Sequence, residues 1–135
     1  MTNPSMPILQ VSDLKVHFPI KSGARGKAGV SVHAVDGVSF SIARGTSFGL
    51  VGESGSGKST TALACVRLVD ATAGRILVNG VDVVGLSGES LRQARRAFQI
   101  IFQDPYSSLN PRERAGAIVR RPLDLMQIGT SKERS

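Results

Sequence analysis

Apolar and polar residues alternate over short stretches early in the chain, a pattern typical of strands with one buried face. The longest such stretch is 8–18, in which the alternation is regular from Leu14 onward. Pro19 follows it and predicts a sheet edge or an exit from the sheet, because proline has no backbone N–H to donate. The polar, glycine-rich residues 21–29 then predict a surface loop.

Two pairs of shorter apolar stretches predict further strands: 32–35 with 38–42, and 76–78 with 81–84. Asp36 and Gly37 separate the first pair, and Asn79 and Gly80 separate the second. Both dipeptides favour the left-handed backbone of a two-residue turn, and Asn-Gly is the strongest short hairpin signal. Two antiparallel hairpins are therefore expected.

Two continuous apolar runs show no alternation and predict strands that are covered on both faces. They are 47–51, directly before a glycine-rich segment, and 99–102. Ser87 or Ser90 is suited to cap a helix. The expected fold class is α/β, with an antiparallel β portion packed beside a parallel core sheet. Helix-forming residues predict four helices, at 62–68, 87–96, 115–120 and 122–127. Two prolines with Asx and serine residues predict a loop at 104–111.

The segment after the run 47–51 matches G-x-x-x-x-G-K-[ST], in the strand–loop–helix setting that this phosphate-binding motif requires. Glycines let main-chain N–H groups turn inward, and the following helix adds the positive end of its dipole. Amides arranged in this way form a cavity for phosphate oxygens. The predicted binding residues are Gly52, Glu53, Ser54, Gly55, Ser56, Gly57, Lys58, Ser59, Thr60 and Thr61.

Two side chains of this loop add charge and metal chemistry. Lys58 is suited to place its ammonium against the terminal phosphates of a nucleotide, and the Ser59 hydroxyl is suited to ligate the Mg²⁺ that bridges them. The alternative is a glycine-rich turn with a chance lysine, which the flanking strand and helix patterns disfavour.

Composition narrows the class of protein. The chain has 41% hydrophobic, 20% charged and only 4% aromatic residues, so a globular fold with an aliphatic core is expected. The single cysteine, Cys65, excludes an internal disulfide and is expected to be a small core residue. No apolar run approaches the ~18 residues that span a bilayer, and the N-terminus lacks a secretory-signal pattern. A cytoplasmic protein is expected, with membrane contact only through partners.

The formal net charge of +7 indicates an anionic partner: nucleic acid, anionic lipid or nucleotide phosphate. The basic residues are spread along the chain, and no stretch interleaves them with aromatic residues as a base-stacking platform does. Solvated faces therefore account for most of the charge. An unrelated basic P-loop protein or nucleic-acid-binding protein is kept as an alternative, while no nucleic-acid partner is expected.

Taken together, these segments resemble the nucleotide-binding subunit of ABC transporters, and within that family the ATP-binding subunits of oligopeptide and dipeptide importers. The stretches that carry the resemblance are 35–40, 50–60 and, most specifically, 101–112, which reads Ile-Phe-Gln-Asp-Pro-Tyr-Ser-Ser-Leu-Asn-Pro-Arg. The resemblance covers nearly the whole chain and is weakest at 21–30 and beyond residue 122. It implies a P-loop NTPase fold, with ATP and Mg²⁺ as cofactors.

The resemblance also implies roles for two further residues. Phe18 falls where the family has an aromatic residue that stacks on adenine, with simple edge packing as the alternative. Gln103 falls at the Q-loop, whose side chain reaches Mg²⁺ and the attacking water, so Ser59 and Gln103 are the implied metal ligands. The implied partners are transmembrane permease subunits and a second ATP-binding subunit, at the inner face of the cell membrane.

Several motifs of the family have no counterpart in the 135 residues: the Leu-Ser-Gly-Gly-Gln signature, the Walker B Asp, the catalytic Glu and the switch His. Residues 86–90 begin like the signature but precede the Q-loop, and His17 and His33 both precede the phosphate loop. Residues 1–135 are therefore expected to be a truncated nucleotide-binding domain with an incomplete parallel core sheet and exposed apolar edges. The expected function is ATP binding for a peptide importer; the alternative is a remnant that binds ATP without turnover.

Overall fold

The computed structural model describes residues 6–20, 30–104, 108–126 and 128–130 of the 135-residue chain. The chain divides into two compact units, Met1–Phe98 and Gln99–Ser135. All strands of the described residues, and the phosphate-loop segment, belong to the first unit. Some predicted loop and helix positions lie outside the described residues: 21–29, 105–107 and 127.

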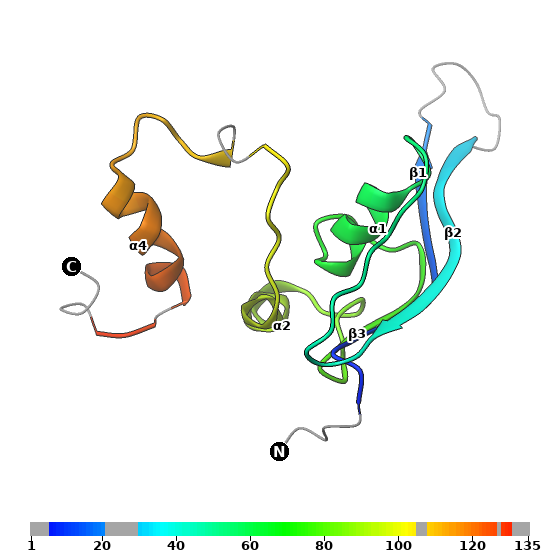
Figure 1. Ribbon diagram of the computed structural model, residues 1–135, viewed down its shortest axis with the longest axis horizontal. Helices are drawn as coiled ribbons and strands as arrows, with labels where there is room; N and C mark the ends of the chain where they lie inside the picture. The colour runs from blue at the N-terminus through cyan, green and yellow to red at the C-terminus, as the bar shows by residue number, and fades with distance from the viewer. Residues whose placement is uncertain (1–5, 21–29, 105–107, 127, 131–135) are drawn as a thin grey trace. The chain divides into compact units, whose positions relative to one another are not determined.

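Four strands of the first unit form one antiparallel sheet, in the order β2-β1-β3-β4 (Figure 1). β1 pairs on one side with β2 and on the other with β3, so it is the strand that joins the sheet together. The predicted antiparallel portion of an α/β fold is thus confirmed. The strands are β1 (Leu9–Pro19), β2 (Ser31–Ile42), β3 (Ala73–Val78) and β4 (Val81–Asp82).

The core of this unit lies where the sheet packs against helix α1 (Lys58–Cys65). Leu14 and Val16 of β1 are buried, as are Ile76 of β3 and Ala64 of α1. The alternation that begins at Leu14 has this physical basis at Leu14 and Val16, which face the core on either side of the half-exposed Lys15. Burying one aliphatic side chain of this kind contributes about 1.5–3 kcal/mol. The aliphatic core expected from the low aromatic content is therefore what holds the unit together.

The predicted hairpin turn at Asp36 and Gly37 is wrong, because β2 runs through both residues as one strand paired with β1. Leu14 pairs with Val38 and Lys15 with Asp36, which leaves Gly37 as an extra residue in β2 with a φ of +80°. This is a β-bulge, in which a glycine adopts the left-handed conformation without ending the strand. β1 is long enough to pair with both halves of β2, and this long-range pairing overrides the local turn preference.

The second predicted hairpin is confirmed. Asn79 and Gly80 connect β3 to β4 with φ values of +51° and +81°, as a two-residue type I′ turn requires. β4 is shorter than the predicted strand, because the chain leaves the sheet at Val83. That side chain is fully buried, and its N–H donates to the Ile76 carbonyl at 2.9 Å. The hairpin therefore closes the core as well as the sheet.

The two continuous apolar runs do not form the predicted strands. Val51 in the run 47–51 is 90% exposed, and Ile101 in the run 99–102 is 94% exposed. Within the described residues neither run is paired with a strand. An extended segment without a partner leaves its N–H and C=O groups to water, so it does not persist as a strand. The described part of the chain consequently contains no parallel strand pair.

The helices of the first unit differ in their bounds from the predictions. α1 begins at Lys58, within the motif and not after it. The next predicted helix forms as α2 (Gly88–Ala94), which continues into a short 3-10 helix, η1 (Arg95–Ala97). Ser87 occupies the N-cap position of α2, but no side-chain hydrogen bond caps this helix. Instead, the Ser90 hydroxyl donates to the Ser87 carbonyl at 2.7 Å.

The second unit contains α4 (Ala115–Met126), a single helix where the sequence predicts two. Pro122 lies inside it and lacks the N–H that would bond one turn earlier, which is why a break is expected there. The Arg120 guanidinium pairs with the Asp124 carboxylate across the proline at 3.1 Å, so the two halves are also linked through side chains. None of the helices in the described part of the chain combines the length and hydrophobicity needed to cross a membrane.

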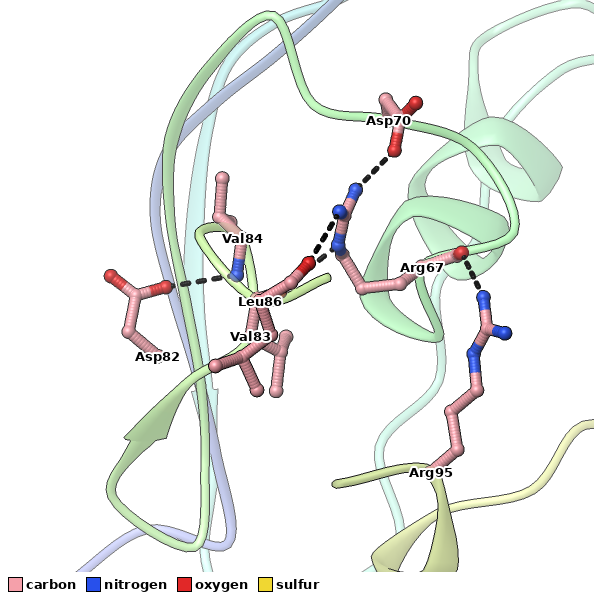
Figure 2. Close-up of polar contacts among 7 residues, drawn as sticks. All are labelled: Arg67, Asp70, Asp82, Val83, Val84, Leu86 and Arg95. Atoms are coloured by element: carbon pink, nitrogen blue, oxygen red, sulfur yellow. Dashed lines mark hydrogen bonds and ion pairs between the residues drawn. The ribbon is translucent and has the colours of Figure 1, made fainter. Parts of the chain in front are cut away.

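One arginine ties the end of α1 to the connection between β4 and α2 (Figure 2). The side chain of Arg67 is only 10% exposed. Its Nε donates to the Val83 carbonyl at 2.9 Å, another guanidinium nitrogen donates to the Leu86 carbonyl at 3.2 Å, and a third pairs with Asp70. Arg95 in turn donates to the Arg67 carbonyl at 2.7 Å. A single side chain thus donates to two backbone carbonyls, of which that of Val83 also accepts from the Leu86 N–H at 3.4 Å.

Replacing this arginine tests its structural role. Arg67→Met is expected to lower the free energy of unfolding by about 1–3 kcal/mol, because the Leu86 carbonyl loses the donor that Arg67 supplies and an unsatisfied acceptor of this kind costs about 1–3 kcal/mol. Arg92→Met is the matched control, since Arg92 pairs with Glu89 on the exposed face of α2 and such pairs contribute about 0–1 kcal/mol. Urea unfolding followed by circular dichroism measures both. Equal losses for the two variants would contradict the role of Arg67.

Burial of Cys65 gives a second test of the core. The side chain packs against the core cluster, as the sequence predicted, and burial raises the pKa of its thiol from 9.0 to about 11. The thiolate is then roughly 100-fold rarer at about pH 8, so iodoacetamide should modify the native chain about 100-fold more slowly than the urea-unfolded chain. Quenched time points analysed by mass spectrometry measure the two rates.

The same pKa sets the direction of a pH effect. Because the folded-state pKa of Cys65 lies above the ordinary value, the unfolded chain releases this proton first as pH rises. Stability associated with the neutral thiol is therefore present below pH 9.0 and is lost as pH rises toward about 11. Similar alkylation rates in the native and unfolded states would contradict the burial of the thiol.

Candidate functional site

The glycine-rich segment 52–57 runs directly into α1, and its last residue rests on β2. Gly57 occupies the N-cap position of α1 with a φ of +86°, a left-handed conformation that favours glycine. A Cβ atom at this position would lie 2.3 Å from the carbonyl oxygen of Ala34 in β2. The loop can therefore seat against the strand only because position 57 has no side chain.

A cavity of about 240 Å³ lies where the loop meets β2. This volume is below the roughly 300–1,000 Å³ of pockets that enclose a whole small-molecule ligand. The cavity is therefore suited to part of a ligand, such as a chain of phosphates, with the remainder outside. It is lined by Val32, His33 and Ala34 of β2 and by Gly55, Gly57, Lys58, Ser59 and Thr60.

The cavity has the charge of an anion site. The Lys58 ammonium donates to the carbonyl oxygen of Glu53 and to the Ser56 hydroxyl, the latter at 3.1 Å, so it spans the loop. The first turn of α1 carries no acidic side chain, and no side chain caps its N–H groups. The positive end of the helix dipole consequently adds to the lysine charge at the same place. This arrangement is able to bind a phosphate or another small anion.

The remaining motif residues shape the loop. Thr61 is buried, and its hydroxyl donates to the Gly57 carbonyl at 2.9 Å, so it fastens the loop to the helix and does not line the cavity. The Ser56 N–H donates to the Glu53 carbonyl at 3.2 Å and closes the turn. Those predicted binding residues that form this turn without lining the cavity are Gly52, Glu53, Ser54 and Ser56.

The two residues implied by family resemblance lie in different units. Phe18 is 43% exposed near the end of β1, where it pairs with Val32, one of the cavity-lining residues. An exposed ring is thus one strand away from the cavity. Gln103 is exposed and belongs to the second unit.

Sequence reasoning missed the contribution of β2 to this site. Val32, His33 and Ala34 line the cavity, although nothing in their spacing from the motif indicates it. The only signal was Gly57 itself, since a glycine in a motif can mark a close backbone approach. Which backbone approaches it depends on the pairing of β2 with β1, and that pairing is a property of the folded sheet.

Comparison with known proteins identifies the family of this chain. The family model described as ABC transporter matches residues 35–133. The oligopeptide transport ATP-binding protein AppF of Bacillus subtilis is 45% identical over 129 residues, which are 95% of this chain and 39% of AppF. The glutathione import ATP-binding protein GsiA of Salmonella typhimurium is 46% identical over 123 residues, which are 91% of this chain and 20% of GsiA. The chain therefore spans well under half the length of these relatives.

Solved structures agree with the sequence relatives. The dimeric structure of MJ0796, a bacterial ABC transporter cassette, superposes with a TM-score of 0.72 at 25% sequence identity and covers 93% of this chain and 52% of that one. A second structure of the same cassette, bound to ADP and Pi in a post-hydrolysis state, matches equally well. The family model extends over most of the chain, and the fold agrees with it. The chain belongs to the ABC transporter family.

Proposed function

We propose that this chain is the ATP-binding part of an ABC-type importer. The observation that supports the proposal most directly is the seating of the phosphate loop on β2, with Lys58 and the uncapped start of α1 at one cavity. A nucleotide triphosphate is the anion that this motif binds in the strand–loop–helix setting. Its phosphates occupy the cavity, while the base and sugar lie outside, as the small volume requires.

Each predicted residue has a role in this proposal. The Lys58 ammonium leaves its contacts within the loop and moves onto the β- and γ-phosphates. The Ser59 hydroxyl, which lines the cavity, ligates Mg²⁺. Phe18 stacks on adenine through its exposed ring. Gln103, which falls at the Q-loop of the family, would complete the metal site and orient water. When Mg²⁺ is bound, its charge neutralises part of the negative charge of the phosphates.

The names of the relatives support a proposal for the transported substrate. AppF is named as an oligopeptide transport protein, and a related protein of Sinorhizobium fredii, y4tS, is named as a probable peptide ABC transporter subunit. We therefore assign peptides as the transported class. Residues 1–135 form a partial nucleotide-binding domain that works with transmembrane permease subunits and a second ATP-binding subunit. With these partners, the proposed location of the chain is the cytoplasm, at the inner face of the cell membrane.

A second candidate function is ATP binding without turnover. The observation that favours it lies in the sequence, where no apolar run ends in the Asp-Glu pair that would hold Mg²⁺ and activate water. Phosphoryl transfer to water needs phosphate positioning, a supported metal and a group that orients or deprotonates the water. Of these, the 135 residues supply the first fully and the second only through Ser59 and Gln103.

ATP binding depends on one ammonium group in this proposal. Lys58→Ala is expected to lower ATP affinity at least about tenfold, since a hydrogen bond to a charged group contributes roughly 1.5–3 kcal/mol. Arg75→Ala is the matched control: it removes an equal charge from an exposed pair with Asp82 on the sheet and should leave the affinity unchanged. Isothermal titration with ATP and Mg²⁺ measures all three proteins. Equal affinities for the wild type and Lys58→Ala would refute the proposal.

Turnover separates the two candidates. Under conditions in which ATP is bound, residues 1–135 are expected to release phosphate no faster than the Lys58→Ala variant, because they do not include the Asp-Glu pair that would hold Mg²⁺ and activate water. A coupled assay for inorganic phosphate measures the rate. Release by the wild type that Lys58→Ala abolishes would reject the binding-only function and retain the ATPase.

A further inference from the structure

The two histidines of the chain, 16 residues apart in the sequence, meet on neighbouring strands. His17 of β1 pairs directly with His33 of β2, next to a register shift after Val16. Their rings are stacked, with centroids 3.8 Å apart and planes within 7° of parallel. Residues of paired strands have side chains on the same face, so the sheet itself holds the two imidazoles together. The sequence contains no other histidine.

A carboxylate faces both rings. Asp36 Oδ1 lies 3.6 Å from His17 Nε2, and Asp36 Oδ2 lies 3.7 Å from His33 Nδ1. Asp36 stands beside the bulge at Gly37, whose left-handed backbone keeps β2 paired on both sides of it. All three ligand atoms lie within 4.8 Å of one another. Both nitrogen–oxygen distances are too long for a hydrogen bond, so Asp36 is close to both rings but bonded to neither.

One ring nitrogen in this cluster is buried without a hydrogen-bond partner in the described part of the chain. His17 Nε2 has almost no solvent exposure and no hydrogen-bond partner among the described residues. Leaving a buried polar atom unsatisfied costs about 1–3 kcal/mol. A group that accepts the lone pair of this nitrogen would remove that penalty. A metal ion is such a group, because the neutral imidazole is the commonest protein ligand for transition metals.

A serine on the same strand contacts the ring of His33. The Ser31 hydroxyl lies 3.1 Å from His33 Nε2 and is within hydrogen-bond reach of it. With that nitrogen as the donor, the lone pair of His33 is on Nδ1, which faces Asp36. A hydrogen bond to the second ring nitrogen is the usual way in which a ligating histidine is held.

Lys15 opposes metal binding. Its ammonium lies 3.9 Å from Asp36 Oδ1 and competes with a cation for the carboxylate. The pair is exposed, and pairs of this kind contribute only about 0–1 kcal/mol, so a divalent ion is able to displace it.

We propose that His17, His33 and Asp36 form a binding site for a divalent transition-metal ion of the zinc class. Imidazole nitrogens bind Zn²⁺ at about 2.0–2.1 Å, so tetrahedral ligand atoms lie ~3.4 Å apart, close to the separations from Asp36. The parallel rings open slightly so that both lone pairs converge, a rotation that the exposed side chain of His33 permits. Water fills the open coordination position. Since His33 also lines the phosphate cavity, the ion lies beside the candidate ATP site but does not depend on it.

Zinc titration of the 135-residue chain tests this site. One Zn²⁺ ion is expected to bind per chain by isothermal titration, with shifts of both imidazole resonances in ¹⁵N–¹H spectra. Those spectra report on the proposed site alone, because the sequence has only two histidines. His33→Ala, Asp36→Asn and His17→Ala should each lower the affinity at least about tenfold, whereas Lys15→Met should raise it, since it removes the competing cation.

Control variants distinguish this site from zinc binding elsewhere on the chain. Cys65→Ala should leave zinc binding unchanged, because the thiol is buried and belongs to the core. Circular dichroism of each variant shows whether it is folded. If His17→Ala does not fold, His33→Ala still tests the site, because His33 is the more exposed of the two histidines. Undiminished binding by folded His33→Ala and Asp36→Asn would overturn the proposal. So would imidazole resonances that do not shift when Zn²⁺ is added.

Discussion

The close contact between Gly57 and the Ala34 carbonyl is the constraint on which the candidate site depends. It places the start of α1 against β2, so that helix dipole, loop and strand enclose one cavity. Any side chain at position 57 would meet backbone oxygen, which has no rotamer by which to move away. The cavity is therefore a joint product of a local motif and a distant strand, and neither would form it alone.

β2 has more roles than its sequence indicates. It pairs with β1 along its whole length, supports the phosphate loop at Ala34 and carries two of the three groups in the histidine–carboxylate cluster. The bulge at Gly37 makes this possible, since an extra residue is absorbed without a turn. A hairpin at this point would have separated the residues that now lie on one continuous strand.

The apolar runs 47–51 and 99–102 illustrate the limit of pattern reasoning. Their hydrophobicity is typical of parallel strands, which are buried on both faces. Hydrophobicity alone does not make a strand, because the backbone also needs hydrogen-bonding partners in register. Within the described residues these partners are absent, and Val51 and Ile101 are largely exposed. A strand is thus a property of two segments, whereas a motif of glycines and a lysine belongs to one.

The sequence by itself determined the features that depend on neighbouring residues: the alternation of β1, the turn at Asn79 and Gly80, and the phosphate motif that leads into a helix. Their physics is local, since backbone conformation and side-chain period act over a few positions. Only the tertiary structure decided that Gly37 forms a bulge, that Ala34 supports the loop and that His17 meets His33. These contacts arise from strand register, which is set by the packing of the whole sheet on its core.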